Sequence, residues 1–257
     1  MFISDMLNFI RKINIYDLII FSLLLLSLFG THTFGFEKTI PQILIAILAT
    51  SLLDLIIKFL LFKKFLIPKS GIITGLFIGT ILEAGIPYFI LLVAAIIAIL
   101  SKHFIKYKRF GNNIFNPAML SLLFTSYFFN VSLGWWLVVE PISLFILGSL
   151  VIFNFKRYDL FFSFIATYFL LFSIFTLGNI NFIFNELKNW VIYFFAFFML
   201  TEPKTSPTTT NGRILYGTLV AILILLIRFF SPLPQFALPL GLIIGNLLVP
   251  IINLKIS

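Results

Sequence analysis

The chain is built from long apolar runs that are separated only by short polar breaks. Ten such runs lie at 15–35, 41–62, 71–85, 86–105, 114–130, 135–154, 158–177, 189–201, 214–230 and 236–253. A helix that crosses a bilayer needs about 20 apolar residues. Only 11% of the residues are charged, whereas soluble domains have about a quarter. We therefore expect an all-α, polytopic membrane protein of about ten transmembrane helices, folded as one transmembrane domain over residues 1–257.

The lengths and the number of these runs lead to two further expectations. The runs at 71–85 and 189–201 are short for full crossings and adjoin Gly, Pro and polar residues, so we expect broken or tilted helices there. Ten spans divide into two sets of five, and an odd number of spans makes the second set enter the membrane from the opposite side. This arithmetic predicts an inverted five-plus-five repeat with halves 1–131 and 132–257.

The distribution of basic residues predicts the orientation. With ten spans, fifteen of the eighteen Lys and Arg residues fall on the side of the N-terminus. Cytoplasmic loops are enriched in these residues, so we expect a multi-pass protein of the cell (inner or plasma) membrane with both termini in the cytoplasm. In a soluble protein, a net charge of +9 would suggest nucleic acid as a partner. Here the basic loops account for it, and no nucleic-acid partner is expected.

The residue inventory excludes several kinds of chemistry. The chain has no cysteine, which removes disulfides, thiolate metal sites, iron–sulfur clusters and thiol nucleophiles. His32 and His103 are isolated in the sequence and form no ligand spacing with carboxylates, so no metal site is predicted.

The first polar segment that interrupts the apolar pattern is Lys69–Leu76. Gly71, Gly75 and Gly79 recur every four residues there, on one face of the predicted helix. Such a stripe allows the backbone of a neighbouring helix, or a ligand, to approach closely. Ordinary helix packing is the more common reason for this pattern.

The second segment is Gly111–Met119, which follows a basic stretch and opens the fifth run. Asn116 before Pro117 is a typical N-cap with proline at the first helical position. The free backbone amides of such a helix start suit an anion or a ring system rich in carbonyl groups. A well-capped helix end beside membrane-surface charge explains the pattern equally well.

The third segment, Thr201–Arg213, is the longest polar stretch. Pro203 and Pro207 restrict it, its hydroxyl groups can bond to their own backbone, and Asn211-Gly212 favours a turn. We interpret it as a loop that folds back to line a cavity near the membrane surface.

Ionisable groups inside apolar runs are costly and are therefore functional candidates. Asp54 lies within the second run and Glu140 lies within the sixth, directly before Pro141. Both are candidates for an ion pathway, although Asp54 can also pair with Lys58 one turn later. Arg228, near the end of the ninth run, can pair with an acid or reach the membrane surface.

In this order, the three segments resemble a known family of membrane subunits. It comprises the RnfD protein of the Rnf electron-transport complex and its counterpart in the sodium-pumping NADH:quinone oxidoreductase. SGIITGL (70–76) is similar to the family pattern S-A-L-x-T-G-L, and GNNIFNPAM (111–119) is similar to G-x-N-x-F-N-P-A-M. TEPKTSPTTTNGRILYG (201–217) resembles T-D-P-V-T-x-x-T-T-x-x-G-R-x-x-x-G, and the resemblance extends over essentially the whole chain.

The resemblance implies a ten-helix bundle similar to urea-transporter-like folds. It also implies a membrane subunit of a flavin-dependent electron-transport complex, with other subunits as partners, that couples electron transfer to Na⁺ or H⁺ movement. Family members typically carry FMN joined to a threonine in the loop after the Asn-Pro helix. Here that loop is about 130–134 and contains no threonine, and Thr125 lacks the family's surrounding pattern. Covalent FMN is therefore not expected.

A non-covalent flavin, either riboflavin or FMN, remains compatible with the residues present. An isoalloxazine ring needs an apolar slot, donors for its carbonyls and a positive field. The residues expected to supply these contacts are Thr74, Asn112, Asn113, Asn116, Thr205, Thr208 and Arg213. Two alternatives stay open. One is a stand-alone transporter or channel for a small solute on the same scaffold, and the other is an assembly scaffold without redox sites.

Overall fold

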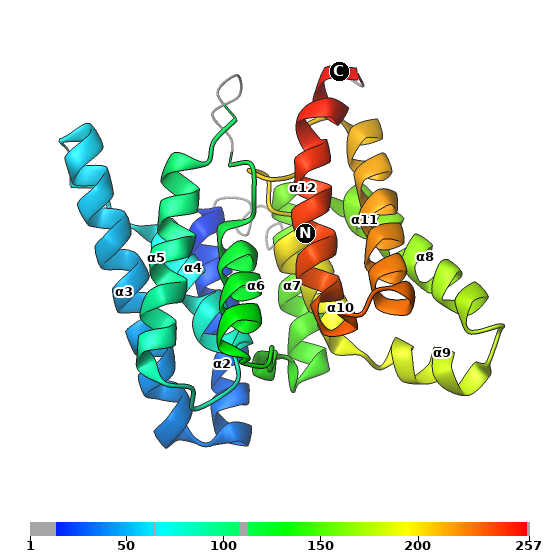
Figure 1. Ribbon diagram of the computed structural model, residues 1–257, viewed down its shortest axis with the longest axis horizontal. Helices are drawn as coiled ribbons and strands as arrows, with labels where there is room; N and C mark the ends of the chain where they lie inside the picture. The colour runs from blue at the N-terminus through cyan, green and yellow to red at the C-terminus, as the bar shows by residue number, and fades with distance from the viewer. Residues whose placement is uncertain (1–13, 64, 108–112, 256–257) are drawn as a thin grey trace, which may run out of the picture.

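The computed structural model describes residues 14–63, 65–107 and 113–255, which form a bundle of helices (Figure 1). The helices of eight or more residues are α2 (Ile15–Phe34), α3 (Phe36–Phe62), α4 (Lys69–Ile81), α5 (Tyr88–Phe104), α6 (Pro117–Phe129), α7 (Pro141–Phe155), α8 (Tyr158–Phe175), α9 (Ile180–Leu187), α11 (Thr210–Phe230) and α12 (Ala237–Lys255). The shorter ones are α10 (Trp190–Phe194), the π-helical η2 (Phe195–Leu200) and the 3₁₀ turns η1 (Trp136–Val138) and η3 (Pro234–Phe236).

The ten predicted apolar runs correspond to the helices of the structure. Nine runs each contain one long helix, and the run at 189–201 contains α10 and η2 in succession. Helices α2, α3, α8 and α11, and the segment Pro234–Lys255, are each long and apolar enough to cross a membrane, and α9 with α10–η2 qualifies as a pair bent by 50°. The chain is therefore an all-α, multi-pass membrane protein, as predicted.

The remaining four apolar helices are shorter. Helices α4 and α6 have 13 residues each, which gives about 20 Å at 1.5 Å per residue, against about 30 Å for the hydrocarbon core. That each of them completes a crossing stays a prediction. Helix α9 was not predicted, because it is short and its polar residues interrupt the apolar pattern. Two of its aromatic side chains, Phe182 and Phe184, are exposed.

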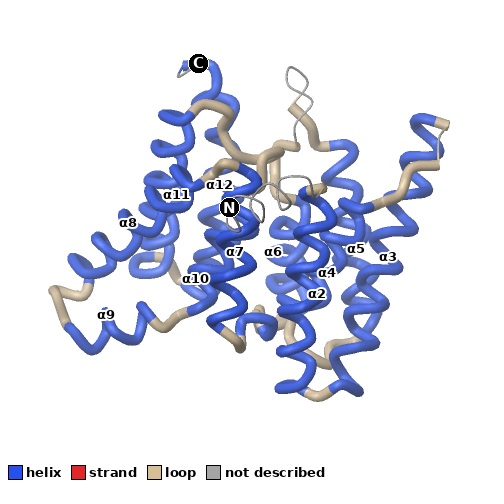
Figure 2. Tube along the Cα trace, turned by 180° about the vertical axis from the view of Figure 1, so that it is seen from behind, coloured by secondary structure: helices blue, strands red, loops and turns tan. Residues whose placement is uncertain are grey.

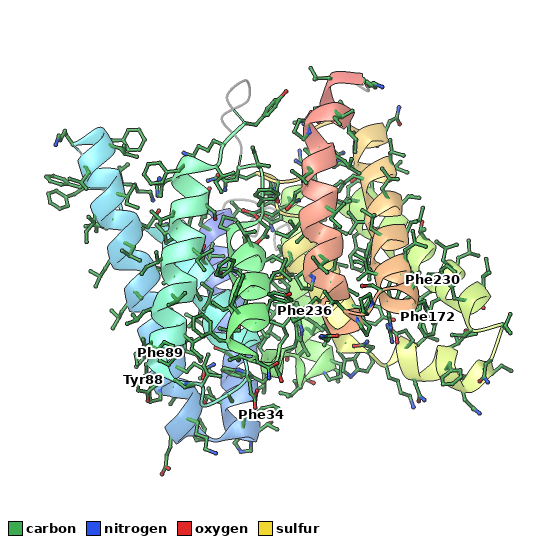
Figure 3. All side chains as sticks on the ribbon, in the orientation of Figure 1. Phe34, Tyr88, Phe89, Phe172, Phe230 and Phe236 are labelled. Carbon is green, nitrogen blue, oxygen red and sulfur yellow. The ribbon has the colours of Figure 1, made fainter. Side chains whose placement is uncertain are left out.

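The outer surface of the bundle is apolar, as lipid requires. Along α3, Leu44, Leu48, Leu52 and Ile56 recur every four residues, and each side chain is 49–59% exposed. The opposite side of α3 buries polar groups instead. Large exposed aromatic side chains such as Tyr88 and Phe89 lie at the start of α5, low in the view of Figure 3. An apolar exterior over polar interior groups identifies lipid as the solvent of these helices.

Two faces of the bundle are distinguished below. The motif face carries the start of α4, the start of α6 and the loop 201–209, and it is the upper face in Figure 1. The far face carries the α2–α3 junction and α9. Figure 2 shows the loop segments that precede α6 and α11 beside each other at the motif face.

Equivalent helices of the two predicted halves make equivalent contacts. Helix α3 packs on α5 as α8 packs on α11, α5 packs on α6 as α11 packs on α12, and α2 packs on α4 as α7 packs on η2. The halves meet through α2 with α7 and through α6 with α12. The internal repeat, its halves 1–131 and 132–257 and their inverted relation stay predictions.

Candidate functional site

The glycine stripe of the first segment brings α4 directly against α3. A Cβ atom on Gly75 would lie 2.6 Å from the Cα atom of Ile47, and one on Gly79 would lie 3.0 Å from that of Ile43. The predicted close helix approach is therefore present, and its partner is another helix. Because this face of α4 is occupied by α3, its other face, with Ser70, is free to line a cavity.

The second segment caps α6 as predicted. The Asn116 side chain accepts a hydrogen bond from the Met119 amide at 2.9 Å, with Pro117 at the first helical position. The backbone N–H of Asn116 donates to Asn246 of α12 at 3.0 Å. Asn113 forms a backbone bridge with Lys106 and is buried, whereas Asn112 lies outside the described residues.

The third segment folds back onto the second, as the sequence predicted. The Asn116 side-chain amide donates to the Glu202 carboxylate at 2.9 Å, and the Thr205 hydroxyl donates to the same oxygen at 3.3 Å. Asn246 fastens the loop by donating to the Thr205 carbonyl at 3.0 Å and to the Tyr216 hydroxyl at 2.7 Å. Desolvation raises the pKa of the Glu202 carboxyl above its ordinary value.

The three segments enclose a cavity of about 320 Å³, which we call the slot. Its walls are largely apolar, and α2, α4, α6, α7 and η2 all contribute to it. The lining residues are Ile15, Tyr16, Ile19, Ser70, Ile73, Thr74, Phe77, Lys102, Asn113, Asn116, Pro117, Ala118, Phe155, Phe198, Glu202, Pro203 and Lys204. A mostly apolar cavity with a few convergent polar groups is the usual form of a small-molecule site.

A second cavity of about 360 Å³ adjoins the slot on the motif face, and we call it the lysine basin. Its cationic residues are Lys58, Lys69, Lys102, Lys106 and Lys204, with His103 beside them. Tyr16, Ser70, Lys102, Asn113 and Lys204 line both cavities, so the slot opens into the basin. An apolar chamber therefore has a cationic mouth.

The buried carboxylate of Asp54 organises this mouth. It is fully buried, accepts a hydrogen bond from Lys102 at 2.9 Å and forms an ion pair with Lys58 at 2.7 Å, and His103 Nε2 lies 2.8 Å from it. The Lys102 ammonium also donates to the Ser70 hydroxyl at 2.6 Å. The expected pairing with Lys58 is present, and the pairing with Lys102 fixes a positive charge at the boundary between slot and basin.

The predicted cofactor-binding residues separate into two groups. Thr74, Asn113 and Asn116 line the slot. Thr205, Thr208 and Arg213 do not line it: they hold the loop in place. The Thr208 amide donates to Asn253 at 3.1 Å, and the Arg213 guanidinium pairs with Asp159 of α8 at 2.8 Å.

The expectation that Glu140 lies inside a helix is wrong. Glu140 is the N-cap of α7, and its carboxylate accepts from the backbone N–H groups of Ile142 and Ser143. Proline at the next position explains this placement, because Pro141 starts the helix and does not interrupt it. Asp54 lies near the motif face and Glu140 lies near the far face, so this conformation does not bring the two carboxylates together.

Sequence reasoning missed several functional groups. Glu202 lies in the third segment and was assigned no role from the sequence, yet it lines the slot. In a chain with 35 phenylalanines, the sequence does not indicate that Phe77, Phe155 and Phe198 line a cavity.

Arg228 pairs with an acid, which is one of its two expected roles. It contacts Glu186 of α9 at 2.6 Å, and both side chains form a hydrogen bond of 2.7 Å with the Tyr168 hydroxyl.

The family comparison covers nearly the whole chain. The model of the NQR2, RnfD, RnfE family matches residues 10–145 and 138–257. Curated relatives include the D-type subunits of the ion-translocating oxidoreductase complexes of Cronobacter sakazakii and Tolumonas auensis, each 41% identical over 58 residues, and that of Salmonella enteritidis, 40% identical over 58 residues. These stretches are 23% of this chain and 16% of each relative's length. With its three signature segments gathered around one slot, the chain belongs to the NQR2, RnfD, RnfE family.

Proposed function

We propose that this chain is the membrane subunit of an ion-translocating, flavin-dependent electron-transport complex and holds a flavin non-covalently in the slot. The observation that carries the proposal is the convergence of all three signature segments on one apolar chamber with a cationic mouth. The names of the relatives support the complex, because each relative is described as one subunit of an ion-translocating oxidoreductase complex.

The slot residues fit a flavin ring. Phe77, Phe155 and Phe198 supply apolar walls, and a cavity of this size lies in the range of about 300–1,000 Å³ that ligands occupy. Asn113 can donate and accept through its side-chain amide. The Lys102 ammonium has three N–H donors and gives two to Asp54 and Ser70, so one remains for a ring carbonyl.

A bound flavin would supply the capacity to accept and release electrons, and the chain would orient it and set its electrostatic surroundings. Lys102 would hold a positive charge at one edge of the ring, while Asp54 fixes the position of that charge. The apolar walls would exclude water from the rest of the ring. Partner subunits would act as electron donor and acceptor.

The non-covalent mode of binding is supported by Thr125. This side chain is fully buried on α6, and its hydroxyl donates to the Ser121 carbonyl at 2.7 Å. In this position the hydroxyl is shielded from a flavin phosphate by the surrounding helices. We propose further that the motif face is cytoplasmic, because five lysines gather in its basin. An ion route involving Asp54 or Glu140 stays a prediction.

Flavin content tests the proposal. The full chain, purified in a mild detergent, is expected to release about one flavin per chain into the supernatant after acid precipitation. The variant Thr74→Phe should fill the slot and lose most of this flavin. Thr33→Phe, the same change at an exposed position of α2, should retain it, and size-exclusion profiles check that both variants fold.

A chain without flavin would contradict the proposal. Flux of a small solute into proteoliposomes by that cofactor-free chain would instead establish a transporter on the same scaffold. Flavin that stays with the acid-precipitated protein would contradict the non-covalent mode of binding.

A further inference from the structure

The lysine basin has positive charge on its walls and no carboxylate to balance it there. Five lysines line it, and none of its lining residues in the described part of the chain is an Asp or a Glu. Two carboxylates pair with these lysines from outside the lining. Asp54 pairs with Lys58 and Lys102, and Asp17 pairs with Lys69 at 2.7 Å. The other two lysines carry a surplus of positive charge.

These two lysines are Lys106 and Lys204. Both residues are exposed, and the described part of the chain gives neither of them an ion pair. A third carboxylate, Glu202, lines the adjoining slot, and it accepts hydrogen bonds from Asn116 and Thr205. Even with Glu202 included, five lysines face three carboxylates. The basin is therefore complementary to an anionic group.

An exposed apolar segment borders the basin at the end of α3. Phe62 and Ile67 line the basin and are 56% and 75% exposed. Other apolar side chains of the same segment are also exposed: Phe59, Leu60, Leu61, Phe65 and Leu66. Because α3 is long and apolar enough to cross the membrane, its end marks the boundary between hydrocarbon and headgroups. Figure 1 shows this end of α3 at the outer edge of the bundle, where lipid has access to it.

A phospholipid combines the two chemistries that meet at this place. Its phosphate is an anionic acceptor, and basic pockets beside membrane helices bind the headgroups of anionic lipids. Its acyl chains are apolar and match the exposed side chains of 59–67. A soluble anion would match only the lysines. We propose that the lysine basin is a binding site for an anionic phospholipid, with the headgroup among the lysines and the acyl chains against residues 59–67.

This lipid site is distinct from the slot. Lys58, Lys69 and Lys106 line the basin and do not line the slot, so the headgroup has three lysines that a ligand in the slot does not use. The lipid site therefore does not depend on the flavin proposed above. Loss of either ligand can be measured without the other.

Binding of single lipids to the full chain tests the proposal. In a non-ionic detergent, the chain is titrated with dioleoyl phosphatidylglycerol, which is anionic, or with dioleoyl phosphatidylcholine, which is zwitterionic and has the same acyl chains. Native mass spectrometry in ammonium acetate gives the Kd of the first bound lipid. Phosphatidylglycerol is expected to bind at least about fivefold more tightly, since each lysine near an anionic headgroup contributes about that factor. The preference should shrink at higher salt, which screens charges, and equal Kd values would overturn the inference.

Two lysine variants locate the site. Lys106→Gln removes a lysine that lines only the basin, so it should weaken phosphatidylglycerol binding by about fivefold and leave phosphatidylcholine binding unchanged. Lys255→Gln removes an exposed lysine from the end of α12, outside both cavities, and should change neither affinity. Equal losses in the two variants would reflect net charge alone and would overturn the inference. Melting temperatures check that both variants are folded.

Two soluble competitors separate the lipid from other anions. Inorganic phosphate and a hexaglutamate peptide, each in molar excess, should leave phosphatidylglycerol bound, because neither has acyl chains to contact residues 59–67. Displacement by phosphate would assign the basin to a free phosphate group. Displacement by the peptide would assign it to an acidic segment of a partner protein. Either displacement would overturn the inference.

Discussion

Replacing Gly75 by alanine should push α3 and α4 apart and destabilise the wall of the slot. The added Cβ atom would lie 2.5 Å from the Thr50 hydroxyl, 2.6 Å from the Ile47 Cα atom and 2.8 Å from the Ala46 carbonyl oxygen. Carbon atoms in contact are ordinarily about 3.5–4.0 Å apart, so the helices must separate by about 1 Å. Two of these atoms belong to the backbone of α3, and rotation of a side chain cannot relieve the clash.

Overpacking of this kind costs about 1–3 kcal/mol. With the size scaling known for soluble domains, this lowers the melting temperature by about 2–12 °C. Thermal unfolding of the detergent-solubilised chain measures the effect, and riboflavin affinity reports the displacement of α4. Gly79→Ala is the graded control, because its nearest contact is 3.0 Å, to Ile43 Cα. A Gly75→Ala variant that melts within about 1 °C of the parent would refute the close approach on which the slot is built.

Three further perturbations test other parts of the structure. Arg228→Leu leaves the buried Glu186 carboxylate without its cation and should lower the free energy of unfolding by about 3–5 kcal/mol. The double variant with Glu186→Leu should recover most of the melting temperature, and no recovery would argue against the ion pair. Asn246→Ala removes the contacts to Asn116, Thr205 and Tyr216, so it should lower the free energy of unfolding by about 1–3 kcal/mol and weaken riboflavin binding. An unchanged affinity for riboflavin would mean that the loop 201–209 keeps its conformation without Asn246. Because the pKa of Glu202 is raised, the folded state favours its protonated form, and the free energy of unfolding should fall as pH rises from about 4.5 through the raised pKa. The melting temperature of Glu202→Gln should decline less across that window, and identical pH profiles would contradict the desolvation of this carboxyl.

The sequence predicts the fold well because lipid imposes a simple pattern. A segment inside the hydrocarbon must satisfy its own backbone hydrogen bonds, so it is helical. The lengths of the apolar runs therefore located nearly every helix. The sequence did not predict α9, because its eight residues, which include two Asn and one Glu, are too few and too polar for an apolar run. It also placed Glu140 inside a helix, because hydropathy does not distinguish the N-cap residue before Pro141 from the apolar residues on either side.

For the site, local signals succeeded and long-range ones did not. The Asn116 cap and the folded-back loop follow from residues within a few positions of each other. The contacts of Asp54 with Lys102 and His103 bridge 48 and 49 positions, so no local pattern shows them. Thr205, Thr208 and Arg213 share the signature segment with Glu202, and sequence spacing alone does not separate residues that line the slot from residues that fix the loop.

The most direct test of the account is whether the signature segments meet on one side of the membrane around one ligand. The natural chain has no cysteine, so single cysteines at Lys69, Lys106, Lys204 and Lys188 can be labelled with a membrane-impermeant maleimide in oriented vesicles. The account predicts that the first three react from the same side and that riboflavin shields the cysteine at Lys204, which lines the slot, whereas the cysteine at Lys188 reacts from the opposite side without shielding. Reaction of any of the three from the side of Lys188, or no shielding at Lys204, would contradict it.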